Sequence, residues 1–153
     1  MKFTLPFFER YLEVVEDAQG ISSLSFTDLN DHPLEVPNAT MIELSEYVEG
    51  KRKTFTRPLN LKGTSFQNKV WQALLTIPYG ETRSYQQIAE IVQSPKALRA
   101  VGQACHVNPV GVIVPCHRVI GKNGKLTGYA GGLEYKVLLL EHEKKWVLDP
   151  FSS

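Results

Sequence analysis

The sequence has no long hydrophobic run, because none of its apolar stretches approaches the roughly 18 uninterrupted residues that span a bilayer. The apolar cluster within residues 1–10 is too short for the core of a secretory signal peptide, and no small-residue cleavage site follows it. These absences disfavour membrane-spanning and secreted proteins. The 153 residues, 42% hydrophobic and 22% charged, suffice to bury a core, so we expect a soluble cytoplasmic protein.

Cysteine is also scarce, with two residues at positions 105 and 116. A disulfide between them is an open alternative, but a chain with an adequate core has little need of one, so we expect two reduced thiols. The four histidines, at positions 32, 106, 117 and 142, do not form a zinc template with the cysteines. We therefore expect no metal site.

Acidic residues are missing from a long central segment, since no Asp or Glu occurs between Glu90 and Glu134. The net charge of the whole chain is only +1. The acid-free segment nevertheless carries the basic residues Lys96, Arg99, Arg118, Lys122 and Lys125. A surface without carboxylates suits a polyanion, because Lys and Arg on phosphates release condensed counterions. The alternative is a mildly basic solvated surface without such a partner.

The first third of the chain predicts a small N-terminal α/β domain at residues 1–62, with an antiparallel hairpin or sheet and one helix. Strand-like runs at residues 11–17 and 21–26 flank Ala18-Gln19-Gly20, a spacing typical of a hairpin. Arg57-Pro58 would then link this domain to the rest of the chain.

The helix of this first domain is predicted from its start and stop signals. Thr40-x-x-Glu43 has the pattern of a capping box and would begin a helix that runs through Val48. Gly50 is a typical residue just after a helix end. A short strand is expected around residues 54–56.

From residue 63 the pattern changes to short helices with clear start signals, which predicts a helical C-terminal domain at residues 63–153. Capping boxes are expected at Thr64-x-x-Gln67 and at Ser84-x-x-Gln87. A last helix should run from residue 133 to residue 144, after a hairpin-type turn at residues 121–125. The expected fold class is α+β.

A further helix is predicted directly after the one that Ser84 begins, with Ser94 as N-cap and Pro95 as its first residue. Lys96 and Arg99 lie three residues apart and would project from one face of this helix. Two short helices joined within a few residues, the second one basic, indicate a DNA-binding helix-turn-helix. An ordinary helical hairpin is the alternative.

The segment from Asn108 to Cys116 is apolar but cannot be regular. Asn108-Pro109 begins a turn, and Gly111 and Pro115 argue against a helix or a central strand. Its valines and Ile113 nevertheless favour burial. A buried irregular segment must find partners for its backbone groups, and natural chains usually tolerate this at a functional site.

Cys116-His117 is a candidate nucleophile and base. A thiol is mostly protonated at neutral pH, and an imidazole within hydrogen-bond reach, directly or through a water, can take its proton. A carboxylate behind the histidine would orient it, and Glu141 and Glu143 are both candidates. The alternative is that Cys116 is an inert buried residue.

The run from Ile113 to Val119 resembles the active-site signature of the O6-alkylguanine-DNA alkyltransferases. Other motifs similar to that family in order and spacing are Phe66-Gln67-x-x-Val70-Trp71, Ile77-Pro78-Tyr79-Gly80, Ser84-Tyr85-x-x-Ile88-Ala89, Arg99-Ala100-Val101-Gly102, Asn108-Pro109, Gly128-Tyr129-x-Gly131-Gly132 and Leu140-x-His142-Glu143. The resemblance is dense over residues 63–144, whereas residues 1–62 match only in outline.

This resemblance implies a catalytic group of five residues. Cys116 would attack the alkyl carbon on guanine O6, and His117 would take the thiol proton through a bridging water. Glu143 would polarise His117, so the resemblance selects Glu143 and not Glu141 as the carboxylate behind the histidine. Asn108 would hold the turn that presents Cys116, where the alternative is a plain Asn-Pro turn. Tyr85 would hydrogen-bond the departing guanine, where the alternative is a tyrosine at the edge of the core.

The resemblance also implies contacts with the substrate. Arg99 would enter the base stack where the lesion was. The expected DNA-binding residues are Arg99, Lys96, Ser94 and Arg118, and the expected pocket residues are Tyr129, Ala130, Val114 and Pro115. The partner would be double-stranded DNA containing O6-alkylguanine, bound by a monomer through the minor groove, with the damaged nucleotide flipped out of the helix.

The implied reaction needs no cofactor and consumes the protein, because S-alkylcysteine is a stable thioether. The protein would therefore be a single-turnover methylated-DNA–protein-cysteine methyltransferase. Its cytoplasmic location would mean the nucleoid in a bacterium, and in a eukaryote we would expect the nucleus. Ala130 and Gly111 stand where some members have serine and proline, which leaves the preferred alkyl size open. The cysteine and histidine ligands of the structural zinc of some members are absent. We also do not expect the regulator form of the family, which carries an additional metal-binding domain.

Two alternatives of another class remain. A non-catalytic lesion-binding helix-turn-helix protein is disfavoured by Cys116, because binding-only relatives usually have tryptophan there. A thiol hydrolase using Cys116 and His117 would turn over and would need an oxyanion hole that the sequence does not identify.

Overall fold

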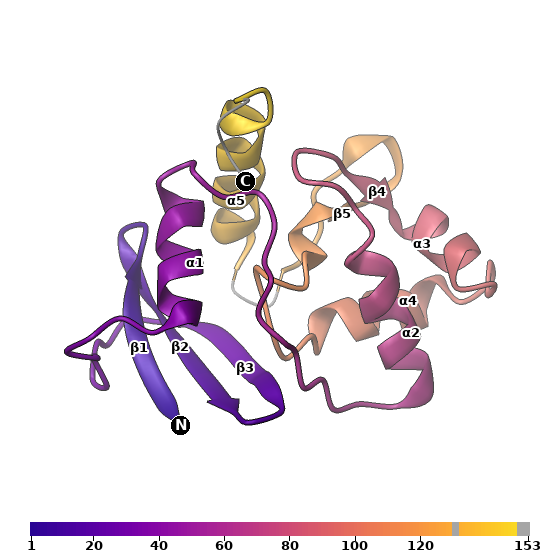
Figure 1. Ribbon diagram of the computed structural model, residues 1–153. Coiled ribbons are helices and arrows are strands. Elements are labelled where there is room, and N and C mark those ends of the chain that lie inside the picture. The colour runs from indigo at the N-terminus through magenta and orange to yellow at the C-terminus, as the bar shows by residue number, and fades with distance from the viewer. Residues whose placement is uncertain (130–131, 150–153) are drawn as a thin grey trace.

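The computed structural model describes residues 1–129 and 132–149, and it has the expected α+β fold (Figure 1). Three antiparallel strands form a sheet in the order β1 (Lys2–Phe7), β2 (Arg10–Asp17) and β3 (Gly20–Thr27). The predicted hairpin is confirmed as β2 and β3. Strand β1 was not predicted, because the apolar cluster within residues 1–10 was considered only as a possible signal peptide. Alternate side chains of β1, Phe3, Leu5 and Phe7, are buried beneath the sheet.

Helix α1 (Ala39–Val48) packs beside β1, but its predicted N-cap was wrong. Asn38 caps the helix, and its side chain accepts a hydrogen bond from the backbone N–H of Met41. Thr40 lies inside the helix, where its hydroxyl donates to Glu16. The predicted helix end is confirmed, since Gly50 follows with φ +76° and a Cβ there would meet the Trp146 ring at 2.4 Å.

The strand expected around residues 54–56 is wrong, because this segment runs as a connector. Glu43 of α1 accepts hydrogen bonds from both the backbone N–H and the hydroxyl of Thr56, so the segment finds its partners without a sheet. Further along, Pro58 and Asn60 exchange backbone hydrogen bonds with Ile21 of β3. The connector is thus held against the sheet before the chain enters the helical half.

The helical half begins with α2 (Ser65–Leu74) and α3 (Tyr85–Ile91). Both predicted capping boxes are confirmed, with Thr64 and Ser84 as N-caps. A two-stranded parallel ladder also lies here, formed by β4 (Arg83–Ser84) and β5 (Val119–Ile120). This ladder brings the start of α3 next to the segment that follows Cys116.

Helix α4 (Leu98–His106) begins three residues later than predicted. Ser94 does not cap it; instead the Ser94 carbonyl accepts a hydrogen bond from Ala97 N–H at 2.9 Å, which closes a turn around Pro95 and Lys96. Ser-Pro suits positions i and i+1 of a turn as well as a helix start, and the turn is what forms. Lys96 therefore lies in the connection between α3 and α4 and not on the second helix.

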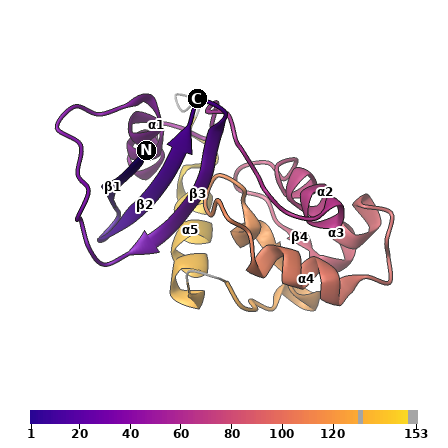
Figure 2. The ribbon, with the colours of Figure 1, turned by 90° about the horizontal axis from the view of Figure 1, so that it is seen from below.

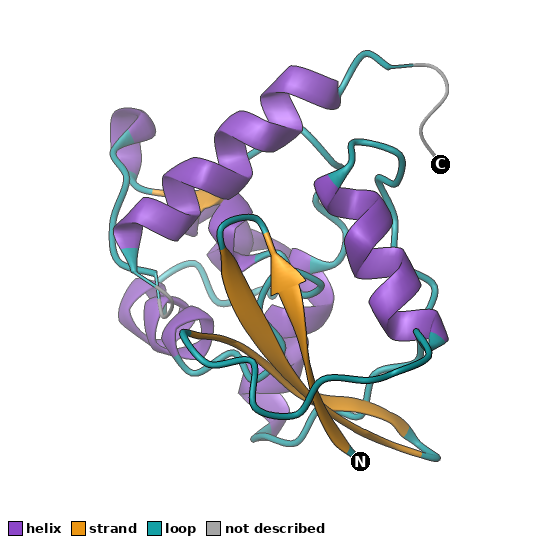
Figure 3. Cartoon of the chain, turned by 90° about the vertical axis from the view of Figure 1, so that its left-hand side faces the viewer, coloured by secondary structure: helices purple, strands orange, loops and turns teal. Residues whose placement is uncertain are grey.

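Helix α5 (Leu133–Trp146) extends two residues beyond the predicted end. It lies between the sheet and the helices α2, α3 and α4 (Figures 1 and 2). Figure 3 shows the strands of the three-stranded sheet gathered at one end of the molecule, with the helices around and behind them. Short 3₁₀ helices η1 (Cys116–Arg118) and η2 (Lys122–Gly124) complete the fold, and η2 occupies the predicted turn.

The sheet also contacts the irregular segment that leads to Cys116. Leu24 of β3 donates its N–H to Pro109 and accepts the N–H of Gly111, at 2.9 and 3.1 Å. One hydrophobic cluster includes buried side chains from both the sheet and the helical half. The division of the chain between residues 62 and 63 stays a prediction. Within the described residues, no helix is both long and apolar enough to span a membrane.

Candidate active site

Asn108 organises the segment that presents Cys116. Its Nδ2 donates to the Val114 carbonyl at 2.9 Å and to Cys116 Sγ at 3.2 Å, and its Oδ1 accepts the N–H of Val110 at 3.0 Å. One amide side chain thus joins both ends of the segment to the sulfur. The predicted turn at Asn108 is present, and it contacts the thiol directly.

Two three-residue turns bend the backbone between Gly111 and Cys116. Ile113 N–H donates to the Gly111 carbonyl at 2.8 Å across Val112, whose φ is +68°. Cys116 N–H donates to the Val114 carbonyl, also at 2.8 Å, across Pro115 at φ −82° and ψ 62°. A β-branched residue with positive φ is strained. Burial of the Val112 side chain opposes that strain, and the result is a rigid approach to the thiol.

Cys116 begins η1 and lines a cavity of about 300 Å³. The other lining residues are Ser23, Leu24, Ser25, Phe26, Asn108, Pro109, Gly111 and Tyr129. Burial raises the pKa of the Cys116 thiol, although the Asn108 hydrogen bond and the nearby Lys136 oppose that rise. The thiol is therefore protonated at neutral pH, and any reaction as a nucleophile requires a base.

His117 is fully buried and supplies a candidate for that base. Its Nε2 lies 2.7 Å from Glu143 Oε2, so the carboxylate favours the tautomer with the proton on Nε2. His117 Nδ1 is buried and has no hydrogen-bond partner within the described residues. Burial lowers the pKa of His117, although Glu143 opposes this shift. A neutral imidazole with a free basic Nδ1 is the form that can accept a proton.

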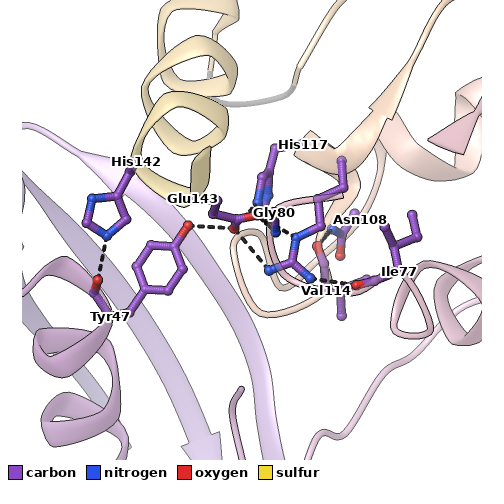
Figure 4. A network of polar contacts seen from close by, with 9 residues as sticks. Tyr47, Ile77, Gly80, Asn108, Val114, His117, His142 and Glu143 are labelled. Carbon is purple, nitrogen blue, oxygen red and sulfur yellow. Dashed lines mark hydrogen bonds and ion pairs between the residues drawn. The ribbon is translucent and has the colours of Figure 1, made fainter. Parts of the chain in front are cut away.

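Glu143 of α5 is the centre of a buried polar network (Figure 4). Besides His117, its carboxylate accepts hydrogen bonds from the Tyr47 hydroxyl at 2.7 Å and from Gly80 N–H at 3.3 Å. Burial alone would raise the pKa of Glu143, but His117 and Arg118 outweigh it and hold the pKa well below its usual value. Glu141 is exposed, so of the two candidate carboxylates only Glu143 reaches His117.

Arg118 was expected to contact DNA, and the structure contradicts this. Its Nε and Nη2 donate to the two oxygens of Glu143 at 2.8 and 3.0 Å, and its Nη1 donates to the Ile77 carbonyl at 2.7 Å. The side chain is buried, and the Tyr79 ring lies 5.7 Å from its guanidinium. The need to neutralise a buried carboxylate directs Arg118 inward, away from any phosphate.

The remaining predicted DNA-binding residues lie on another surface. Arg99 and Tyr85 line a cavity of about 790 Å³ between α3, α4 and η2. Arg99 and Lys96 are exposed, and Ser94 is half-buried in the turn before α4. Tyr85 accepts a hydrogen bond from the Thr127 hydroxyl at 3.1 Å, and burial raises the pKa of Tyr85.

The predicted pocket residues separate into three groups. Tyr129 lines the cavity at Cys116, and its ring lies edge-on to His117 with centroids 6.5 Å apart. Val114 and Pro115 are buried but do not line that cavity, because their backbone forms the turn behind the thiol. Ala130 lies outside the described residues.

Sequence analysis did not identify Lys136 and Tyr47 as part of the site. Lys136 is buried on α5, donates to the Thr127 carbonyl at 2.9 Å, and burial lowers its pKa. The sequence carried one signal for it, since Lys136 and Glu143 are two helical turns apart and so share a face of α5. Tyr47 comes from the first third of the chain, and no local pattern connects it to Glu143.

Comparisons with known proteins agree with the motifs around this site. Residues 65–145 match the family described as 6-O-methylguanine DNA methyltransferase, DNA binding domain. The chain is 59% identical over 104 residues to the inducible methylated-DNA–protein-cysteine methyltransferase of Bacillus subtilis; the match covers 68% of this chain but only 58% of that relative. It is 58% identical over 118 residues to the constitutive protein of the same organism, covering 75% of this chain and 72% of the relative.

The fold is similar to that of a solved structure over nearly its whole length. The structure of Mycobacterium tuberculosis OGT in complex with DNA has a TM-score of 0.86 and 43% sequence identity, and the match covers 95% of this chain and 93% of that one. The similarity therefore includes the sheet and α1 as well as the helical half.

Proposed function

This chain belongs to the 6-O-methylguanine DNA methyltransferase family, and from that membership we propose that it repairs DNA by taking an alkyl group from O6-alkylguanine onto Cys116. The observation that carries the proposal is the buried arrangement of Cys116, Asn108, His117 and Glu143. It places a thiol that lines a cavity next in sequence to a buried base, and the base is supported by a carboxylate.

The transfer step forms one bond and breaks one. Cys116 Sγ attacks the alkyl carbon, the S–C bond forms, and the bond between that carbon and guanine O6 breaks. The thiol proton passes through a bridging water to His117 Nδ1, and Glu143 stabilises the imidazolium that results. The guanine anion that departs takes up a proton from water to become normal guanine, and the proton held by His117 balances this when it is released to solvent. The Tyr85 hydroxyl donates a hydrogen bond to the departing base.

The proposed partner is double-stranded DNA, bound by a single copy of the chain. The exposed Arg99 and Lys96 and the half-buried Ser94 lie at the junction of α3 and α4, next to the cavity that Tyr85 lines. A guanine in the duplex is shielded by stacking and pairing, so the damaged nucleotide has to flip out at a cost of a few kcal/mol. Arg99 would fill the space in the stack that the base leaves.

Transfer would occur once per molecule and without a cofactor. Water has no good leaving group to displace from S-alkylcysteine, so the thioether is permanent and the protein is consumed. Such a protein would act wherever the cell keeps its DNA, which for a bacterial chain means the cytoplasm.

Intact-protein mass spectrometry tests the proposal. The protein is mixed with a duplex that carries one O6-methylguanine, and both the protein and its Cys116 peptide are weighed. We expect one added methyl group at Cys116 and no further repair after one equivalent. Cys116→Ser should bind the duplex and leave the lesion, whereas the matched variant Cys105→Ser should still transfer.

Two other outcomes of this experiment would reject the proposal. Binding of the lesion by the unchanged protein, with no mass gain, would indicate a lesion-binding protein. Repair beyond one equivalent with an unmodified thiol would indicate a hydrolase.

A further inference from the structure

Tyr47 connects the N-terminal half of the molecule to the candidate active site. It lies on α1, and its hydroxyl donates to Glu143 Oε2 at 2.7 Å, across 96 positions of sequence. The backbone carbonyl of the same residue accepts a hydrogen bond from His142 Nε2 at 2.6 Å. Figure 4 shows both contacts, which attach α1 to two successive residues of α5.

The Tyr47 ring is held in place by aromatic side chains. Its neighbours are Phe7, stacked at 6.0 Å between centroids, His142 at 5.1 Å, Phe55 at 5.6 Å and Tyr79 at 6.1 Å. The ring is fully buried, so its hydroxyl has no route to solvent. Packing alone would be satisfied by phenylalanine; the hydroxyl adds one interaction, and that interaction is with Glu143.

The hydroxyl shares Glu143 Oε2 with His117. That oxygen lies 2.7 Å from both the Tyr47 hydroxyl and His117 Nε2. A donor on a carboxylate oxygen spreads its negative charge and so weakens its pull on the imidazole proton. Burial and Glu143 raise the pKa of Tyr47 well above its usual value, so Tyr47 stays a neutral donor.

We propose that Tyr47 is a positioning residue for the transfer reaction, and that α1 uses its hydroxyl to set the orientation of Glu143 and the basicity of His117. This inference rests on the proposed function, because the proton that His117 accepts is the proton of Cys116. It gives the N-terminal half a chemical part in the site, in addition to its contact with the segment before Cys116.

Tyr47→Phe tests this role with a measurement that packing alone does not change. Without the hydroxyl, Glu143 Oε2 keeps more negative charge and stabilises the His117 imidazolium. The rate of single-turnover transfer from an O6-methylguanine duplex falls as the pH is lowered, and in Tyr47→Phe this fall should begin at a higher pH than in the wild type. At neutral pH the rate should fall about three- to tenfold, with unchanged DNA affinity. Besides Tyr47, the titratable and charged groups that face this pair are Arg118, Lys136, Tyr79, Tyr129 and His142.

Tyr135→Phe is the matched control. Tyr135 is buried on α5, and its hydroxyl has no hydrogen-bond partner in the part of the chain that the structure describes. Its removal should leave the pH profile of transfer in place. An unshifted pH profile for Tyr47→Phe would overturn the inference, whether or not the unfolding temperature of the variant falls.

Alkylation of Cys116 by iodoacetamide without DNA separates this inference from the proposed function. The extent of reaction is followed at the Cys116 peptide by mass spectrometry between about pH 5 and 8, the range over which histidine titrates. We expect the acid side of this profile to move upward in Tyr47→Phe as well. A wild type that reacts with iodoacetamide but never takes an alkyl group from DNA rejects the proposed function alone, whereas identical iodoacetamide profiles reject the role of Tyr47.

Discussion

Arg118 and Arg99 have the same side chain but different surroundings, because Arg118 is buried in an ion pair and Arg99 is exposed. The Arg118 guanidinium forms a fork on Glu143 inside the molecule, whereas Arg99 is exposed on α4. A buried carboxylate without its cation is costly, because neither water nor another charge replaces the lost partner. A solvated arginine on the proposed DNA-binding surface would contribute to DNA affinity and little to folding.

The pair Arg118→Met and Arg99→Met separates these tasks. Arg118→Met should lower the free energy of unfolding by about 3 kcal/mol, because it leaves Glu143 with an uncompensated buried charge. Arg99→Met should change stability by less than about 0.5 kcal/mol, while the affinity for a duplex that carries the lesion falls, because no planar cation then fills the gap in the base stack. Urea unfolding and titrations with that duplex measure both effects. Equal stability of the two variants would contradict the assignment.

Asn108 is the second residue for which a single substitution is informative. Asn108→Ala removes hydrogen bonds to Val110, Val114 and Cys116 and leaves the buried N–H of Val110 without its Asn108 acceptor. We expect a loss of about 2–3 kcal/mol of stability and a slower reaction of the thiol with iodoacetamide. Asn68→Ala is the control, because Asn68 bonds only carbonyls at the start of its own helix, and it should cost less than about 0.5 kcal/mol. A stable Asn108→Ala with an unaltered thiol would refute this account.

At the scale of elements, the neighbouring helices α3 and α4 begin in different ways. Helix α3 has a complete capping box at Ser84, in which the hydroxyl accepts Gln87 N–H at 3.1 Å and the Gln87 side chain accepts Ser84 N–H at 2.8 Å. Helix α4 has no side-chain cap, and the turn around Pro95 leads into it. The connection is therefore a tight turn with exposed Lys96 at its tip, a shape that can approach DNA closely.

Serine-to-alanine substitutions at the two starts should differ. Ser84→Ala should cost about 1 kcal/mol, since it removes the acceptor for an N-terminal N–H of α3. Ser94→Ala should cost less than about 0.5 kcal/mol, because the Ser94 contribution to the turn comes from its backbone carbonyl. Thermal unfolding followed by circular dichroism measures both. A larger loss for Ser94→Ala would mean that its hydroxyl supports α4 after all.

At the scale of the whole molecule, the site is made where three parts of the chain meet. The sheet edge at Leu24 pairs with the segment before Cys116, α1 brings Tyr47, and α5 brings Glu143. Lys53 also donates to the carbonyls of Val147 and Asp149 just after α5, which fastens that helix to the N-terminal half. Stability and catalytic geometry thus depend on the same contacts.

This arrangement predicts how stability responds to acid. Burial puts the pKa of folded His117 below its ordinary value of 6.5, so its contribution is complete above that pH and is lost as the pH falls below it. The pKa of Glu143 is also depressed, and its contribution is complete above the ordinary value of 4.5 and fades at lower pH. Urea unfolding from pH 7.5 to 4 should show both losses.

His117→Gln should flatten the loss of stability that begins near pH 6.5. His106→Gln, at an exposed position of α4, is the control and should keep that loss. His142, whose pKa burial also lowers, contributes in the same direction in every variant. An unchanged pH dependence in His117→Gln would show that another group causes the acid loss.

Elements with strong local signals, and the candidate pair Cys116-His117, could be predicted without the structure. The capping boxes at Thr64 and Ser84 and the last helix were predictable because their hydrogen bonds lie within a few residues. Cys116-His117 was recognisable from its irregular apolar surroundings and its family motif. The predicted start of α4 was wrong because Ser-Pro fits both a helix start and a turn. Only the contacts of α4 with α2 and α3 decide between these two structures.

Tertiary structure alone decided which partners the charged groups take. The direction of Arg118, the contact of Tyr47 with Glu143 and the burial of Lys136 join residues that no local pattern connects. Their cause is the cost of leaving a charge unpaired in a closed interior, and that cost exists only once the chain has closed around it. The same closure brings a thiol, a base and a carboxylate together, which the sequence could name but not place.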